Sequence, residues 1–155
     1  MSWEAIGGLL TGVATAVAAV LVILQLCELN KQAKLSHFSD YTKRFNDIVV
    51  NLPEDVMRAD FVLAGRADRD HVMRTLRRYF DLSYEEWFLH QRGLIAKDIW
   101  QLWEMGIKAG CGKTAIQQAW AIIKTGTTFD APFVAFIDGL IASHKTGASP
   151  LAMAS

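Results

Sequence analysis

Cysteine and net charge are scarce in this sequence, and each scarcity limits what the protein can be. The 155 residues include two cysteines, Cys27 and Cys111. So low a cysteine content is typical of proteins in a reducing compartment. They lie in different predicted segments, so we do not expect them to pair. Sixteen basic and sixteen acidic side chains cancel, so no overall field draws the chain to nucleic acid. We therefore expect no nucleic-acid polymer among its partners.

Motifs for metal binding and catalysis are also missing. Glu86 and His90 share a predicted helical face, but metal sites in helical bundles need Glu and His three residues apart and repeated on a second helix. His37, His71 and His144 have no partner pattern, and no cysteine–histidine spacing of the zinc type occurs. The sequence therefore predicts no enzyme, no metal site and no cofactor.

The short stretch GCGKT resembles the end of a phosphate-binding loop. That loop needs a glycine five residues before its second glycine, which would fall at Ile107, whereas the nearest glycine is Gly106. The loop must also follow a β-strand, and the residues before it have helical periodicity. We expect Gly110 and Gly112 to end one helix and Thr114 to cap the next.

The main positive feature is a run without charge from Ala5 to Leu24, with Glu4 before it and Glu28 after it. About twenty apolar residues in a helix cross a bilayer, and a continuous helix satisfies its own backbone hydrogen bonds in lipid. A cleaved signal peptide would need a basic start, which MSWEA lacks. A buried helix would need a partner of similar hydropathy, and the chain offers none. The run therefore predicts a transmembrane helix, with Trp3 at its outer edge.

Basic residues indicate the orientation of this span. Lys31, Lys34, Lys43 and Arg44 follow it, whereas only the α-amine and Glu4 precede it. The positive-inside rule places the C-terminal part in the cytoplasm and the N-terminus outside. The sequence thus predicts a single-pass protein of the cytoplasmic membrane.

Small residues recur every four positions within the span, at Gly8, Gly12 and Ala16. Such spacing lets two membrane helices approach closely. We expect these residues to pack against a second copy or a partner helix. Alternatively, the span contains these glycines without packing against any other helix.

Helical periodicity continues beyond the span. Phe38, Tyr41, Phe45, Ile48 and Leu52 follow one another at spacings of three and four. Pro53 then disfavours helix at the preceding residue. One long helix from about residue 3 to 51 is expected, although a break near residue 30 would give two.

Four segments follow from these patterns. The predicted parts are a transmembrane anchor (1–28), a juxtamembrane helix (29–52), a helical cytoplasmic domain (53–144) and a flexible tail (145–155). Within the domain, helices are predicted in 53–65, 68–93, 97–110, 114–126 and 130–144, with Gly93 ending the second and Asp130 capping the last. No segment has the pattern of a strand. The fold class is all-α, a transmembrane helix continuing into a small helical bundle.

Five arginines between residues 66 and 78 form the densest basic cluster. Arg74, Arg77 and Arg78 share one helical face. Guanidinium groups bind phosphate in a bidentate manner, so this face is a candidate site for anionic lipid headgroups or a phosphorylated ligand. A solvated face paired with neighbouring aspartates is the alternative.

The order of these features resembles an uncharacterised bacterial family of membrane-anchored helical proteins. The likeness lies in the acidic start MSWEAI, the glycine- and alanine-rich span and the stretch LRRYFDLSYEEWFLHQRGLIAKDIWQLW, with a turn marked by Gly93, Leu94 and Trp100. The resemblance implies a bacterial inner membrane and the architecture above. It implies no activity and no site residues.

These observations favour a non-enzymatic function. We expect an interaction or scaffold protein, or an accessory subunit, whose partners are the lipid bilayer and either itself or another membrane-protein subunit. A ligand-gated membrane effector, as in some antiviral systems, is the second hypothesis; the arginine cluster would bind a phosphorylated messenger. An enzyme using Glu86 or His90 comes last.

Overall fold

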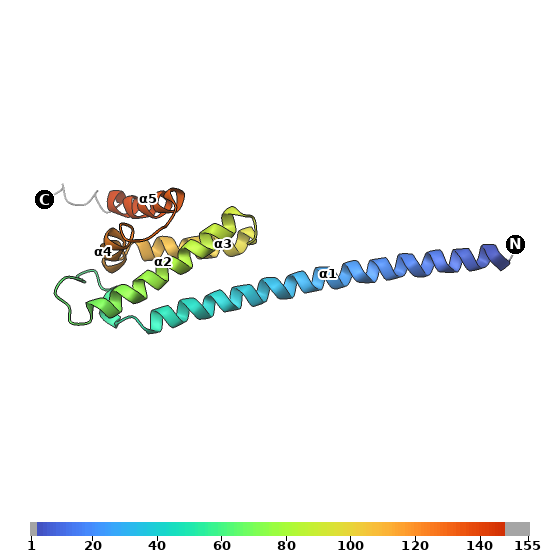
Figure 1. Cartoon of the computed structure of the whole chain (residues 1–155), viewed down its shortest axis with the longest axis horizontal. Helices are drawn as coiled ribbons and strands as arrows, with labels where there is room; N and C mark the ends of the chain where they lie inside the picture. The colour runs from blue at the N-terminus through green and yellow to red at the C-terminus, as the bar shows by residue number, and fades with distance from the viewer. Residues whose placement is uncertain (1–2, 148–155) are drawn as a thin grey trace. The chain divides into compact units, whose positions relative to one another are not determined.

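The computed structural model describes residues 3–147, and it gives side-chain surroundings for all of these except 3–17, 33–35 and 147. Within this range the chain consists of helices joined by turns and loops, without a strand, so the all-α prediction is confirmed (Figure 1). By its internal contacts the chain divides into two compact units, Met1–Asp40 and Tyr41–Ser155. The elements are α1 (Trp3–Val50), the 3-10 helix η1 (Glu54–Met57), α2 (Arg69–Gln91), α3 (Lys97–Cys111), α4 (Thr114–Ile123) and α5 (Ala131–Gly147).

The first helix is uninterrupted. It has 48 residues, which corresponds to a length of about 72 Å, and the alternative break near residue 30 is not observed. Its last turn tightens, with the Asn51 amide bonded to the Ile48 carbonyl at 3.2 Å and the Leu52 amide to the Val49 carbonyl at 3.1 Å. Pro53 follows directly, as expected for a residue that cannot continue the helix.

The predicted membrane span coincides only in part with the described side chains. Among those side chains, no helix combines the length and the hydropathy that a membrane crossing requires. Most of the span, and the packing motif of Gly8, Gly12 and Ala16, falls in residues 3–17 and so lies outside the described side chains. Both therefore stay predictions. The predicted tail also lies mainly outside the described residues.

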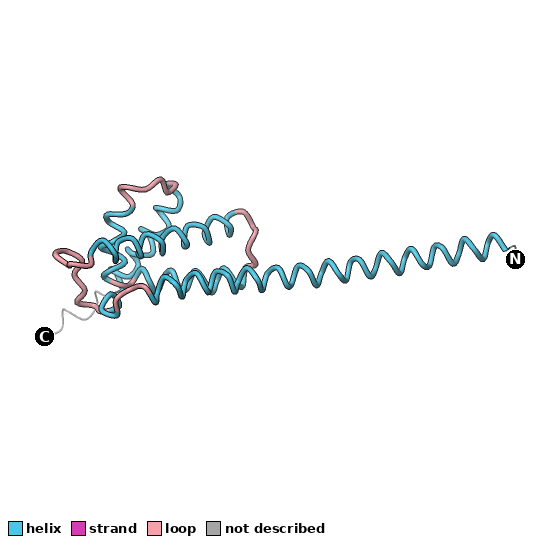
Figure 2. Tube along the Cα trace, turned by 60° about the horizontal axis from the view of Figure 1, so that its bottom comes forward, coloured by secondary structure: helices cyan, strands magenta, loops and turns pink. Residues whose placement is uncertain are grey.

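The helix predicted in residues 53–65 is wrong. The structure has only η1 there, followed by an irregular segment up to α2, seen as a loop in Figure 2. Gln118 of α4 explains the difference, because its side-chain amide takes the place of helical hydrogen bonds. The Leu63 amide donates to Gln118 Oε1 at 2.8 Å, and Gln118 Nε2 donates to the Phe61 carbonyl at 3.1 Å. Phe61 and Leu63 are both buried.

An aromatic core joins α2, α4 and α5. The ring centroids of Phe80 and Trp120 lie 4.7 Å apart, and those of Tyr84 and Phe133 lie 5.0 Å apart with the rings edge to face. Such pairs stabilise a core beyond the area that they bury. Most of the apolar side predicted for α2 is buried, but Phe88 stays 37% exposed and lies beneath the Arg92 guanidinium.

A polar contact also connects α4 to α5. Asp138 accepts hydrogen bonds from Trp120 Nε1 at 2.8 Å and from Lys124 Nζ at 2.9 Å. The indole N–H of the buried Trp120 thereby finds the partner that a buried donor requires. The fifth helix is therefore held by its apolar face and by this carboxylate.

Gly93 and Asp130 mark helix ends as predicted, whereas Thr114 does not. Gly93 follows α2 with φ +66°, a conformation that suits glycine. Asp130 Oδ1 accepts from the Phe133 amide at 3.0 Å at the start of α5, which is the predicted cap. Thr114 does not cap α4: its hydroxyl donates to the Ala59 carbonyl at 3.1 Å. Tertiary contact with the irregular segment takes the side chain away from the helix end.

Gly110 is required for packing rather than for ending a helix. It lies inside α3, and a methyl group in its place would collide with the Tyr79 hydroxyl. The glycine lets α2 and α3 approach closely at this point. Of the two glycines predicted to end this helix, Gly112 does so as the C-cap of α3, whereas Gly110 lies within the helix, which continues to Cys111.

Candidate functional site

An apolar collar surrounds α1 at residues 20–24. Its five side chains are valine, leucine or isoleucine, and each is 52–59% exposed. Because successive residues turn by about 100° around a helix, five of them cover its whole circumference. A helix that packs on a protein core is apolar on one face only, whereas one that is apolar all round suits a wholly apolar environment.

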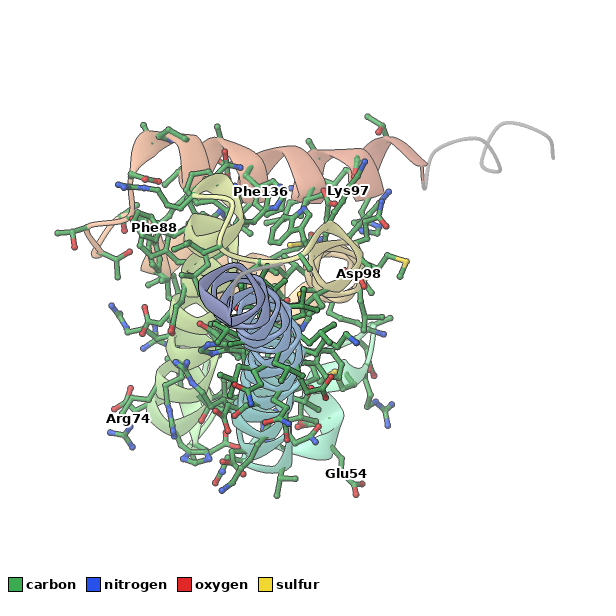
Figure 3. All side chains as sticks on the ribbon, turned by 90° about the vertical axis from the view of Figure 1, so that its right-hand side faces the viewer. Glu54, Arg74, Phe88, Lys97, Asp98 and Phe136 are labelled. Atoms are coloured by element: carbon green, nitrogen blue, oxygen red, sulfur yellow. The ribbon has the colours of Figure 1, made fainter. Side chains whose placement is uncertain are left out.

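The arginine face of α2 is exposed to solvent. Arg74, Arg77 and Arg78 are all exposed, and within the described residues none of them has a carboxylate within 4 Å. Figure 3 shows the Arg74 side chain extending away from the ribbon. Arg77 interacts electrostatically with Asp81, where it opposes the rise of the carboxyl pKa that burial causes, so Arg74 and Arg78 are the guanidinium groups of this face most available to an anion.

Arg66, predicted in the same cluster, has a different role. It binds both Asp55 and Asp68, and its guanidinium lies 5.0 Å from the centroid of the Phe61 ring. It therefore fixes the irregular segment between η1 and α2. Arg66 belongs to the basic cluster but not to the candidate anion-binding face, and its donors are already used by the two aspartates.

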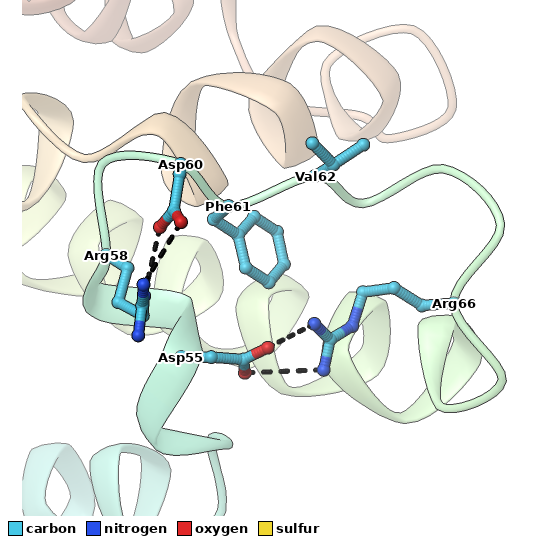
Figure 4. Close-up of a pocket in the computed structure, with 6 residues that line it drawn as sticks. All are labelled: Asp55, Arg58, Asp60, Phe61, Val62 and Arg66. Carbon is cyan, nitrogen blue, oxygen red and sulfur yellow. Dashed lines mark hydrogen bonds and ion pairs between the residues drawn. The ribbon is translucent and has the colours of Figure 1, made fainter.

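A charged cleft of about 320 Å³ lies beside Arg66 (Figure 4). Arg58 Nε binds Asp60 Oδ1 at 3.0 Å, and Arg66 binds Asp55, so the cleft pairs its cations with its own anions. It leaves no spare positive charge for a phosphate. The lining residues are Asp55, Arg58, Asp60, Phe61, Val62 and Arg66.

Adjacent glutamates on α2 have opposite surroundings. Tyr41 Oη and Arg44 Nη2, both from the last turns of α1, donate to Glu85 at 2.7 Å each. The bond from Arg44, and then that from Tyr41, lowers the pKa of Glu85 against the effect of burial. Glu86 is only 7% exposed, and burial raises its pKa from 4.5 to about 8. This carboxyl group is the most perturbed acid of the described chain.

Glu86 and His90, the two residues of the enzyme hypothesis, have different neighbours. The His90 ring stacks on Trp100, with centroids 4.3 Å apart and planes 2° from parallel, whereas Glu86 lies near Arg44 and Glu85. Across the described residues, no group of three or more histidines, cysteines and acids could hold a metal. The buried Trp87, together with Trp100 and Trp120, belongs to the core.

The GCGKT stretch is a turn between two helices. It joins α3 to α4, and its amides bond to helix carbonyls: Gly112 to Ala109 at 3.3 Å and Lys113 to Gly110 at 2.8 Å. A phosphate-binding loop needs such amides free to surround its ligand. The geometry therefore agrees with the sequence argument against a nucleotide loop.

Sequence reasoning missed the contact of Tyr41 and Arg44 with Glu85. The periodic stripe placed Tyr41 on the packing face of the first helix, which was the available signal. Its partner lies 44 residues further along the chain, and no local pattern identifies such a pair.

Comparisons of the chain with protein-family models, with curated proteins and with solved structures give no match in any of the three.

Proposed function

We propose that this chain is a membrane-anchored interaction protein. Its N-terminal helix crosses a bacterial inner membrane once, and its C-terminal bundle binds a protein partner or further copies of itself at the cytoplasmic face. The observation that carries the proposal is the apolar collar at residues 20–24, exposed on every side of α1. The collar is the last part of a run of twenty residues without charge, Ala5 to Leu24, which is the length a bilayer requires.

Continuity of α1 supports an anchor attached directly to the bundle. The helix runs from Trp3 to Val50, so no loop separates the proposed span from the residues that pack in the second unit. Lys31, which pairs with Glu28 at 3.7 Å, begins the basic stretch that favours the cytoplasm. The motif of Gly8, Gly12 and Ala16 would supply the surface for a second copy or a partner helix.

Membrane fractionation of the full chain tests the anchor. We expect the protein in the pellet after ultracentrifugation of lysed cells at high salt, and in solution only after detergent is added. Replacing Val17 and Leu21 by arginine should shift it to the supernatant, because each charge inside the bilayer costs up to about 3 kcal/mol.

The matched control places the same charges on the bundle. Leu94 and Leu102 are also exposed leucines, and the double variant Leu94→Arg/Leu102→Arg should stay in the pellet. A parent chain that remains in the supernatant without detergent contradicts the anchor. Release of the control to the same extent would show that pelleting reports aggregation instead.

A membrane effector that responds to a phosphorylated messenger is the second candidate. It is favoured by the exposed guanidinium groups of Arg74, Arg77 and Arg78, which have no carboxylate within 4 Å among the described residues. A panel of cyclic mono- and dinucleotides should then raise the melting temperature of the full chain in lipid nanodiscs. The variant Arg74→Ala/Arg78→Ala should abolish the shift; a panel without any shift counts against this candidate.

A further inference from the structure

The last turns of α1, residues 41–50, are held on the bundle by few side chains. Tyr41 and Ile48 are the two buried residues among these ten, and Phe45 and Val49, which flank them, stay 42% and 36% exposed. Helix α4 is also ten residues long and buries five. Segments with little buried apolar surface open at a lower free energy than the core. The end of α1 can therefore be released at a lower cost than α4.

Two acids of α2 lie where this end of α1 is attached. Tyr41 Oη and Arg44 Nη2 each donate to Glu85 at 2.7 Å, and on the side of α3 the ring centroids of Tyr41 and Trp103 lie 4.8 Å apart. Glu86, the next residue of α2, is 7% exposed, and among the described residues its carboxyl group accepts no hydrogen bond. Tyr41, Arg44, Glu85 and Glu86 together form what we call the α1 junction.

The charges around Glu86 come from both helices. Burial raises the pKa of Glu86, Arg44 of α1 opposes that rise, and Glu85 adds to it. Burial and the bond to Glu85 raise the pKa of Tyr41, and the charge of Glu86 adds to that rise. Burial also raises the pKa of Tyr79 of α2, again with a contribution from Glu86, whereas α3 presents an uncharged indole at the junction. Burial thus outweighs the one nearby cation, and Glu86 is neutral while α1 covers it.

We propose that the α1 junction is a pH-sensitive switch, in which loss of the Glu86 proton to solvent releases the last turns of α1 from α2 and α3. A buried carboxylate without a hydrogen bond is costly, whereas water hydrates it once α1 moves away. The new charge also repels Glu85 and competes with it for Arg44. Ionisation therefore weakens the contacts that attach α1.

Linkage sets the size of the effect. The pKa of Glu86 is about 8 with the junction closed, and 4.5 is its ordinary value in water. Opening therefore releases a proton at any pH between these two values, so the open form gains stability relative to the closed form as pH rises. The ratio of open to closed form should rise about tenfold per unit of pH between about pH 5 and about pH 8, and should level off above that range.

Hydrogen exchange of the full chain in mild detergent tests the switch, with peptides read by mass spectrometry and rates corrected for the intrinsic pH dependence of exchange. Protection within residues 41–52 should fall about a hundredfold from about pH 6 to about pH 8. At each pH it should also be lower than the protection of α4. Glu86→Gln should abolish the pH dependence, whereas Glu54→Gln, at an exposed position of η1, should leave it unchanged.

Two tyrosine variants provide a second matched comparison. Tyr41→Phe removes a hydrogen bond to an ionised acid, so the open form should become at least about tenfold more populated at every pH, with the same pH dependence. Tyr84→Phe also removes a hydroxyl group, which donates to Asp130 at 3.5 Å, and should leave the exchange of residues 41–52 unchanged.

Three outcomes would overturn the proposal. Exchange within residues 41–52 that does not depend on pH would mean that the end of α1 frays without any role for Glu86. Protection equal to that of α4 at every pH would mean that this segment opens only when the whole bundle unfolds. A pH dependence that persists in Glu86→Gln would assign the effect to another group. The switch lies wholly in the second unit, so its failure would leave the proposed membrane anchor unaffected.

Discussion

Glu85 and Glu86 are neighbours on α2, and their carboxyl groups respond to opposite surroundings. Hydrogen bonds from Arg44 and Tyr41 lower the pKa of Glu85, so its ionised form is stabilised. Glu86 lies in the core, where burial raises its pKa to about 8. The difference follows from their directions on the helix, because successive residues point about 100° apart.

Glu86 should make the protein less stable as pH rises. The pKa of Glu86 is higher in the folded state than the unfolded value of 4.5. Its contribution to the free energy of unfolding is therefore fully present below pH 4.5 and is lost as pH rises to about 8. Glu86→Gln removes this loss. The free energy of unfolding of the variant should exceed that of the parent by on the order of 3 kcal/mol at about pH 9, and by much less at about pH 5.

Thermal unfolding in nanodiscs, followed by tryptophan fluorescence at both pH values, measures this difference. Glu54→Gln, at an exposed position of η1, is the control and should leave the difference between the two pH values unchanged. A Glu86→Gln variant that is less stable than the parent at about pH 9 would contradict the assignment. Its amide would then be worse accommodated than the buried carboxylate.

At the scale of elements, Gln118 holds the buried part of the segment between η1 and α2. Residues 53–65 have the composition of a helix start, yet Phe61 and Leu63 are buried with their backbone bonded to Gln118. Burial of these two side chains and the amide contact together outweigh local helix propensity, which amounts to less than about 1 kcal/mol per residue. The rest of the segment is fixed by Arg66.

Replacing Gln118 should loosen this segment before the bundle unfolds. Gln118→Ala leaves the Leu63 amide and the Phe61 carbonyl without their partner, at a cost of about 1–3 kcal/mol. Trypsin should then cut after Arg58 and Arg66 about tenfold faster than in the parent. Gln101→Ala, at an exposed position of α3, should not change the rate; equal cleavage of both variants would show that Gln118 holds nothing in place.

At the scale of the whole molecule, α1 belongs to both compact units. Residues 20–24, in the first unit, are apolar and 52–59% exposed, whereas Tyr41 and Ile48 in its last turns are buried in the second unit. One helix thus presents an all-round apolar surface in the first unit and a one-sided stripe in the second. The anchor joined to an interaction domain that we propose would use the first pattern in the bilayer and the second in the bundle.

Self-association through the span can be tested with a native thiol. Cys27 is exposed and Cys111 is buried, so a bismaleimide with a long spacer should join two copies in native membranes through Cys27. Gly12→Ile should reduce the crosslinked dimer several-fold, because a large side chain keeps two helices apart. Ala14→Ile, on another face of the helix, should not. If neither the parent nor Gly12→Ile forms a crosslinked dimer, the span does not self-associate through this motif.

Much of the fold could be predicted because its signals are local. The periodic stripe gave the last turns of α1, the apolar spacing of α2 gave most of its buried face, and Gly93 and Asp130 marked helix ends through backbone conformation and capping. Three predictions failed because a group distant in the sequence determines the local structure. The Ala59 carbonyl binds Thr114, the Tyr79 hydroxyl lies against Gly110, and the Gln118 amide holds residues within 53–65.

The sequence by itself determined the class of fold, the order of the helices and the charge-free run, because helix periodicity, capping and hydropathy are properties of neighbouring residues. Only the tertiary structure decided which arginines are occupied, which glutamate is buried and where a cleft opens. Those properties depend on side chains far apart in the chain that meet when the helices pack, and no local pattern encodes such meetings.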